Sequence, residues 1–212
     1  MILFVFEGTR REPYIFGALK KLYWSEEETV VTAYGCNIYA LYNEMQAIGD
    51  GADIVDILKV KYKDCKDNPF NGIERSDAFS EKYLIFDYDF QDVSQPVALL
   101  NNKLETMLKY FNEETENGKL YINYPMVEAI RYTKFLEDID YYKYSVTREE
   151  CRSFKSLVDK FSAYPNADFL IRGDEQVLRQ NWTALKHQNV AKANFICNEQ
   201  NTYPDGHIAS IS

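Results

Sequence analysis

Three acidic residues follow apolar segments that are typical of buried strands. Glu7 comes after residues 2–6, and Asp87 and Asp89 come after residues 83–86. Because side chains alternate along a strand, Asp87 and Asp89 should leave the strand end on the same side. Two carboxylates held close together are unfavourable unless a positive charge lies between them, and a hard divalent cation is the usual partner. The sequence therefore predicts a Mg²⁺ or Mn²⁺ site with Glu7, Asp87 and Asp89 as ligands.

An ion held by these carboxylates could polarise a phosphate group and activate a water molecule for cleavage of a phosphodiester bond. Glu7 has a second candidate role as a general acid or base in that reaction. The alternative interpretation of Asp87 and Asp89 is a pair of loop acids at the exposed edge of a sheet. The apolar character of the preceding segment favours the metal site.

The elements around these acids begin with a strand, a glycine turn and a helix. Residues 1–7 form the strand, and Gly8 permits a tight turn. The segment Thr9-Arg-Arg-Glu12 matches a helix capping box, so a helix is expected over 13–24. This order is the first half of a βαβ unit.

The same alternation continues to about residue 136. Strands are expected over 29–34, 83–87 and 120–124, and helices over 38–48, 53–60, 96–111 and 126–136, with an acidic turn over 112–118. This pattern predicts an α/β fold with a mostly parallel sheet of about four strands flanked by helices. If the first and third strands are neighbours, a right-handed crossover brings all three carboxylates to one edge of the sheet.

The pattern changes beyond residue 137. A second capping box, Thr147-Arg-Glu-Glu150, precedes a helix ending near residue 163, and 174–188 is also helical in pattern. Residues 141–146 are either an edge strand or irregular. The sequence therefore divides into an α/β core over 1–137 and a mainly helical C-terminal extension over 138–212.

Other charged residues could complete the site. Glu128 lies in the first turn of the expected helix and could be a further metal ligand, although the helix dipole alone favours an acid there. Arg10 and Arg11 at a helix start could bind phosphate, or form a solvated helix end. Lys186 and Lys192 could contact phosphate, or belong to an ordinary charged surface helix.

The composition limits the classes of function. The net charge of −9 gives no overall basic surface for nucleic acid, so binding would need a local basic patch, metal ions or a partner. The four cysteines and two histidines have no zinc-site spacing, and no G-x-x-x-x-G-K-[ST] loop occurs. The first residues lack the features of a signal peptide, and no apolar run is long enough to span a membrane. We therefore expect a cytoplasmic protein without a membrane partner.

The order and strand-end context of Glu7 and Asp87-x-Asp89 resemble the Toprim domain. That module occurs in topoisomerases, bacterial primases and the OLD-family nucleases. More narrowly, the segment 7–14, Glu-Gly-Thr-Arg-Arg-Glu-Pro-Tyr, is similar to the opening of small RloB-like Toprim proteins, and 124–128, Tyr-Pro-Met-Val-Glu, is similar to their Pro-x-x-Glu segment. The resemblance covers roughly residues 1–130. The distance from Glu7 to Asp87 is longer than in the smallest Toprim domains, which indicates an insertion near residues 50–80.

The resemblance implies a Toprim-like fold and a Mg²⁺-dependent nuclease acting on DNA or RNA, of a kind often encoded beside ATPases in phage-defence systems. A basic residue late in the chain is common among the nuclease relatives, and Lys186 and Lys192 are the candidates. The alternative is a non-catalytic binding or regulatory module that docks a partner ATPase. Association into homo-oligomers is left open. A haloacid-dehalogenase-like phosphohydrolase is disfavoured, because its Asp-x-Asp normally follows the first strand and not the third.

Overall fold

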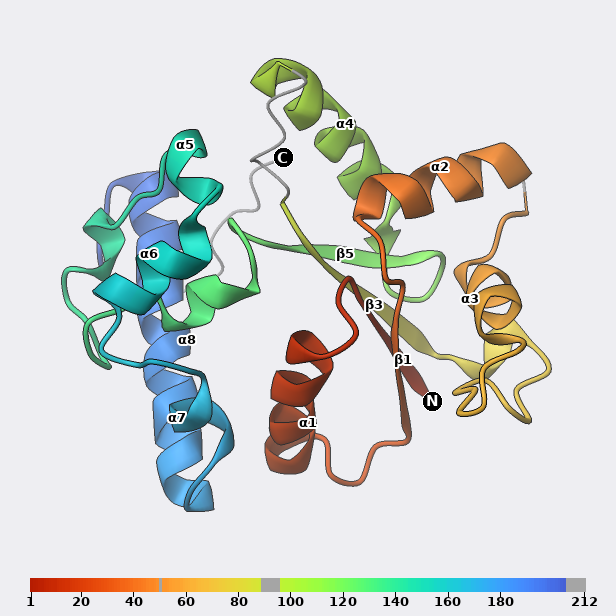
Figure 1. Cartoon of the computed structure of the whole chain (residues 1–212), viewed down its shortest axis with the longest axis horizontal. Coiled ribbons are helices and arrows are strands. Elements are labelled where there is room, and N and C mark those ends of the chain that lie inside the picture. Colours follow the sequence, from red (N-terminus) through yellow and green to blue (C-terminus); the bar gives the residue numbers. More distant parts are fainter. Residues whose placement is uncertain (50, 89–95, 205–212) are drawn as a thin grey trace. The chain divides into compact units, whose positions relative to one another are not determined.

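A computed structural model describes residues 1–49, 51–88 and 96–204 of the chain (Figure 1). The chain forms two compact units, Met1–Val127 and Glu128–Ser212. Their division lies upstream of the boundary expected at residue 137. The first unit contains the sheet, and the second is mainly helical in its described part. The expected sequence of an α/β part followed by a helical part is confirmed.

The sheet of the first unit has the strand order β2-β1-β3-β5-β4 (Figure 1). Its strands are β1 (Ile2–Phe6), β2 (Thr29–Ala33), β3 (Glu81–Asp87), β4 (Asn112–Glu113) and β5 (Gly118–Asn123). Neighbours run parallel, except that β4 is antiparallel to β5. The predicted mostly parallel sheet is therefore confirmed. Because β1 pairs with β3, the first and third strands are the neighbours that the candidate site requires.

The fifth strand was not predicted, because residues 112–118 were assigned to an acidic turn. β4 has only two residues, too few for an alternating pattern to be visible in the sequence. Gly118 makes the return into β5 with a φ of 98°, a conformation that favours glycine. A Cβ atom on Gly118 would also lie 3.2 Å from the Cβ and the carbonyl oxygen of Lys82.

Helices cover both faces of the sheet in the first unit. They are α1 (Arg11–Tyr23), α2 (Ile38–Ile48), α3 (Ile54–Tyr62) and α4 (Val97–Tyr110). On one face, Leu3 and Val5 of β1 join a large core with buried residues of α2, α3 and α4. On the other, Phe4 and Phe6 pack with Phe16 of α1. This alternation fixes the pairing register of β1, since a shift by one residue would exchange the two faces.

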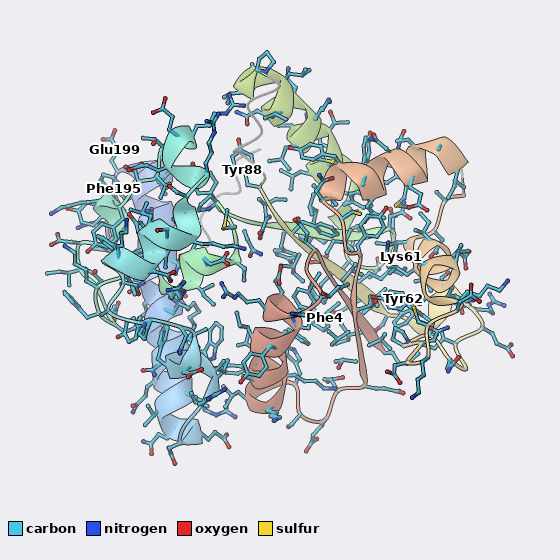
Figure 2. All side chains as sticks on the ribbon, in the orientation of Figure 1. Phe4, Lys61, Tyr62, Tyr88, Phe195 and Glu199 are labelled. Carbon is cyan, nitrogen blue, oxygen red and sulfur yellow. The ribbon has the colours of Figure 1, made fainter. Side chains whose placement is uncertain are left out.

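A tyrosine at the end of α3 forms hydrogen bonds with the backbone of the edge strand β2. The Tyr62 hydroxyl donates to the carbonyl oxygen of Ala33 at 2.6 Å and accepts from the Ala33 amide at 3.1 Å. Figure 2 labels Tyr62 and the neighbouring Lys61, whose ammonium lies 4.7 Å from the centre of the Tyr34 ring. The two Tyr62 hydrogen bonds occupy backbone groups of Ala33 that an edge strand would otherwise offer to another chain.

The second unit contains α5 (Arg148–Cys151), α6 (Phe154–Phe161), α7 (Asp168–Ile171) and α8 (Glu175–Asn198). The predicted capping box before α5 is confirmed, because the Thr147 and Glu150 side chains each bond the backbone amide of the other. The helix α8 continues to Asn198, beyond the expected end at residue 188. Residues 141–143 form a short 3₁₀ helix, so the edge-strand alternative for this segment is wrong.

The helix expected over 126–136 is reduced to a 3₁₀ turn, Val127–Arg131. Tertiary contacts explain the difference. The buried Arg131 side chain donates to the Tyr164 carbonyl oxygen, and the Ser162 hydroxyl donates to the Arg131 carbonyl oxygen. The Arg131 carbonyl oxygen also accepts from the Thr133 amide at 2.9 Å, a tight turn in place of the α-helical bond, so the α-helical pattern is not continued. No helix within the described part of the chain has the length and apolar content to cross a membrane.

Candidate functional site

The carboxyl ends of three neighbouring parallel strands lie at one edge of the sheet. Glu7 directly follows β1, Asp87 ends β3, and Asn123 ends β5. The Glu7 amide donates to the Ile85 carbonyl oxygen at 3.1 Å, and its carbonyl oxygen accepts from Gly35 at 2.9 Å. The Glu7 backbone is therefore held from both sides. Such an edge is where open α/β sheets commonly place their sites.

The structure brings Glu7 and Asp87 together, although they lie eighty positions apart in the sequence. The Asp87 backbone amide donates to Oε2 of Glu7 at 3.1 Å. The Glu7 side chain therefore reaches across from β1 to the end of β3. Two carboxylate residues from adjacent strand ends supply the hard oxygen atoms that Mg²⁺ and Mn²⁺ prefer, so the donor chemistry fits the predicted ion.

The Asp87 carboxylate is held by two donors that the sequence analysis did not include. Its Oδ1 accepts from the Asn123 side-chain amide and from the Val127 backbone amide, both at 3.1 Å. Asn123 is the cross-strand partner of Asp87 in the parallel β3–β5 pair. One feature of the sequence could have indicated Asn123. Asparagine is depleted in strands, and this one ends a strand parallel to that of Asp87.

The third predicted carboxylate, Asp89, lies outside the described residues. Within 1–49, 51–88 and 96–204, no group of three or more His, Cys, Asp or Glu side chains has an arrangement suited to a metal ion. The metal site with Glu7, Asp87 and Asp89 thus stays a prediction.

The turn after Glu7 is closed by Glu12, in a way that differs from the expected capping box. The residue before α1 is Arg10 and not Thr9, and the Arg10 side chain makes no capping hydrogen bond. Instead, the buried Glu12 carboxylate accepts from the Gly8 amide at 3.2 Å. A Cβ atom on Gly8 would lie 2.6 Å from Oε2 of Glu12. A side chain at position 8 would therefore displace the Glu12 carboxylate from the backbone beside Glu7.

We expect Gly8→Ala to lower the free energy of unfolding by about 1.5 kcal/mol, because the added methyl group displaces the Glu12 carboxylate from the Gly8 amide. Gly17→Ala is the matched control, since nothing lies within 4 Å of a Cβ there and Gly17 is inside α1. That change should stabilise the protein by about 0.5–1 kcal/mol. Urea denaturation of both variants checks the pair, and an unchanged stability of Gly8→Ala would contradict the explanation.

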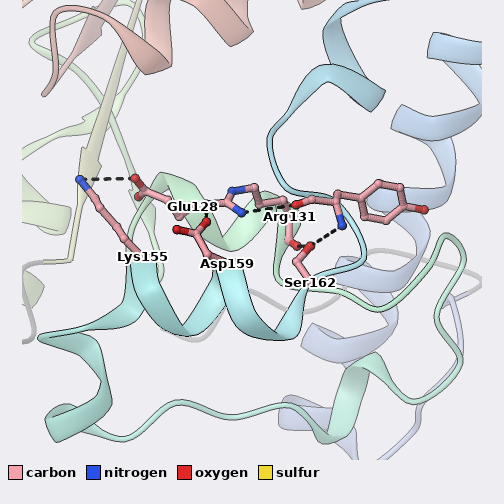
Figure 3. A network of polar contacts seen from close by, with 6 residues as sticks. Glu128, Arg131, Lys155, Asp159 and Ser162 are labelled. Atoms are coloured by element: carbon pink, nitrogen blue, oxygen red, sulfur yellow. Dashed lines mark hydrogen bonds and ion pairs between the residues drawn. The ribbon is translucent and has the colours of Figure 1, made fainter.

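Glu128 is the first residue of the second unit and follows Val127 directly in the chain. Figure 3 shows its buried carboxylate facing Lys155 of α6, with Oε1 3.4 Å from the Lys155 Nζ. Lys155 itself is mostly exposed. Nothing in the sequence separates Lys155 from the other basic residues, because the pairing depends on how α6 packs against the 3₁₀ turn.

The same figure shows a second ion pair in this part of the unit (Figure 3). Arg131 is buried, and its Nη2 lies 2.5 Å from Oδ1 of Asp159 on α6. Glu128 and Arg131, three residues apart in one 3₁₀ turn, are therefore each paired with a residue of α6. This arrangement gives Glu128 a structural role in the second unit, alongside its predicted role as a metal ligand.

The four predicted phosphate-binding residues differ in their surroundings. Arg10 and Arg11 are exposed at the start of α1, immediately after the Glu7–Gly8 turn. Lys186 is exposed on α8, with its ammonium 6.0 Å from the centre of the Tyr203 ring. Lys192, by contrast, is half-buried and donates to the Tyr144 carbonyl oxygen. Because Lys192 is half-buried and already bonded to a backbone carbonyl, a packing role is favoured over phosphate binding.

Burial lowers the pKa of Lys192 below its ordinary value of 10.5. The folded state therefore disfavours the charged lysine, and this loss of stability is present at neutral pH and disappears as the pH rises above the ordinary pKa. Relative to Lys192→Met, the wild-type protein should gain stability as the pH rises toward the ordinary lysine pKa of 10.5. Chemical denaturation across that range checks this. Lys186→Met, on the same helix but exposed, is the control, and an equal pH dependence in the two variants would contradict the assignment.

Comparison with known proteins gives no match to a family model, to a curated protein or to a solved structure. The functional assignment therefore depends on the residues of the sheet edge and on the resemblance of the two short motifs.

Proposed function

We propose that the chain is a Mg²⁺- or Mn²⁺-dependent nuclease of Toprim type, with Glu7, Asp87 and Asp89 as its metal ligands. The observation that supports this most strongly is the contact between Glu7 and the end of β3, where Oε2 accepts from the Asp87 amide at 3.1 Å. Glu7 and Asp87 therefore lie at adjacent strand ends, as a shared metal site would need. The mostly parallel sheet with this strand order is compatible with the proposal.

In this proposal each part of the edge has a defined task. Asp87 and Asp89 hold the ion, and Glu7 either holds it or accepts a proton from the attacking water. The bound ion supplies Lewis acidity toward the phosphate group and acidifies the water. Arg10 and Arg11 follow Glu7 at the start of α1, where backbone amides and the helix dipole also favour an anion, so they are the proposed phosphate contacts.

Purified full-length protein with supercoiled DNA, single-stranded DNA and structured RNA tests the proposal. We expect cleavage of at least one substrate in Mg²⁺ or Mn²⁺, and none when EDTA removes the metal. If none of the three substrates is cleaved in Mg²⁺ or in Mn²⁺, the nuclease proposal is contradicted. The substrate that is cleaved would also show whether the enzyme acts on DNA or RNA.

A second candidate is a non-catalytic module that docks a partner ATPase, as the resemblance to RloB-like proteins suggests. The ion pair of the buried Glu128 with Lys155 favours it, because one expected metal ligand is then part of the packing of the second unit. This candidate predicts no metal-dependent cleavage and a stable complex with an ATPase encoded next to the gene. Cleavage that is lost on removing the metal would exclude it.

A further inference from the structure

We propose that Asn123 is a positioning residue of the metal site, which holds the Asp87 carboxylate in the orientation that binds the ion. This inference rests on the proposed function. It concerns a residue that belongs to neither of the recognised acidic motifs. Its basis is the hydrogen bond from the Asn123 side-chain amide to Oδ1 of Asp87, at 3.1 Å.

Backbone contacts with β3 and with the residue that follows it fix the location of Asn123. Asp87 and Asn123 are paired in the parallel β3–β5 ladder. The carbonyl oxygen of Asn123 also accepts from the Tyr88 amide, at 3.1 Å. The backbone of Asn123 is therefore held beside Asp87, within reach of its carboxylate for the side-chain amide. An amide on a rigid strand end is a more accurate support than one on a loop.

The Val127 amide adds a second donor to the same oxygen of Asp87, at 3.1 Å. Two N–H groups from different segments thus converge on Oδ1, one from β5 and one from the turn that follows it. This arrangement restricts rotation of the carboxylate about its last torsion. Ligating carboxylates are commonly held by such hydrogen bonds, and removing a supporting partner typically weakens metal affinity by about 10–100-fold.

The chemistry of the amide explains why asparagine occupies this position. An aspartate would place a second carboxylate about 3 Å from Asp87, and the two charges would repel each other in the absence of metal. A leucine of similar size would fill the space but donate no hydrogen bond. Asparagine is otherwise unfavourable in a strand, so the side-chain contact with Asp87 is the feature that accounts for it.

The test is direct titration of Mn²⁺ into the full-length protein, with free Mn²⁺ measured by electron paramagnetic resonance. We expect Asn123→Ala and Asn123→Leu each to weaken Mn²⁺ affinity by about 10–100-fold. The thermal stability of the metal-free protein should change little, and saturating Mn²⁺ should restore cleavage. Asn112→Ala, at an exposed asparagine on β4, is the matched control and should bind Mn²⁺ as the wild type does.

The two substitutions separate positioning from packing. If Asn123 only fills space, Asn123→Leu keeps the wild-type affinity and the inference is overturned. If Asp87→Asn abolishes Mn²⁺ binding while both Asn123 variants bind normally, the inference fails and the proposed function stands. If the wild-type protein does not bind Mn²⁺, or Asp87→Asn binds it equally well, the proposed metal site itself is wrong.

Discussion

Asp87→Asn is expected to lower the rate of nucleic-acid cleavage by about a thousand-fold or more while the protein stays folded. The substitution removes the negative charge that would hold the ion in the proposed site, and stabilisation by a catalytic metal contributes several kcal/mol to the transition state. The asparagine keeps a carbonyl oxygen of the same size. That oxygen can still accept from Asn123 and Val127, so the contacts that Oδ1 makes in the wild type are retained.

Glu81→Gln is the matched control for this experiment. Glu81 lies on the same strand as Asp87 but at its opposite end, where it accepts from the Tyr83 hydroxyl at 2.6 Å. Cleavage by Glu81→Gln should equal that of the wild type, and Mn²⁺ should raise its melting temperature equally. Asp87→Asn should show neither metal-dependent cleavage nor a rise in melting temperature with Mn²⁺. Wild-type cleavage by Asp87→Asn would exclude Asp87 from the catalytic site.

The largest effect on stability is expected from Asp138→Ala, in the second unit. Asp138 is buried, and its carboxylate accepts from Tyr144 at 2.7 Å and from the Asp140 amide at 3.0 Å. Longer contacts join it to the Thr133 hydroxyl and the Lys134 amide. The substitution leaves several of these donors without an acceptor, and each buried donor so left costs about 1–3 kcal/mol. We expect a total loss of about 3 kcal/mol in the free energy of unfolding.

Asp140→Ala supplies the control, because Asp140 lies two residues away and pairs with Lys143 in an exposed position. Its loss should be within about 0.5 kcal/mol. A second measurement reports on the contact itself. Burial, followed by the hydrogen bond to Asp138, raises the pKa of Tyr144 above its ordinary value. Asp138→Ala should lower that pKa in a phenolate absorbance titration, and equal stability losses in the two variants would contradict the assigned network.

The part of the site that follows from strand order could be predicted from the sequence. Apolar runs ending in Glu7 and Asp87 indicate two buried parallel strands, and the preference for right-handed crossovers makes their ends meet at one edge. The contact between Glu7 and Asp87 agrees with that prediction. The apolar residues of both strands lie in the buried environment that their pattern indicates.

The supporting residues could not be predicted in the same way, because their roles depend on pairing across the sheet. Asn123 supports Asp87 only because β5 pairs with β3 in one particular register. The buried Glu12 was assigned to a capping box, whereas its carboxylate bonds the Gly8 amide. The contact of Asn123 with Asp87 depends on strand pairing that the sequence pattern does not show. Glu12 and Gly8 are only four residues apart, and there the capping-box pattern indicated the wrong backbone amide.

In the second unit, a helical sequence pattern did not always predict a helix correctly. Residues 126–136 have the composition of a helix, but the contacts of Arg131 with Asp159 and Tyr164 leave a single 3₁₀ turn. The capping box of Thr147 and Glu150 was predicted correctly, because both partners lie within one turn of each other. Local hydrogen bonds were therefore predictable here, whereas the ion pairs with α6 were not.

In the proposed metal site Glu7 and Asp87 hold one divalent ion between them, and a crystal soaked in Mn²⁺ can show whether it is there. Data collected at the manganese absorption edge should show an anomalous peak between the two carboxylates, within about 2.0–2.3 Å of oxygen atoms of each. The peak should be absent from Asp87→Asn crystals soaked in the same way. A wild-type crystal that shows ordered Glu7 and Asp87 side chains and no peak between them at saturating Mn²⁺ would contradict the metal site.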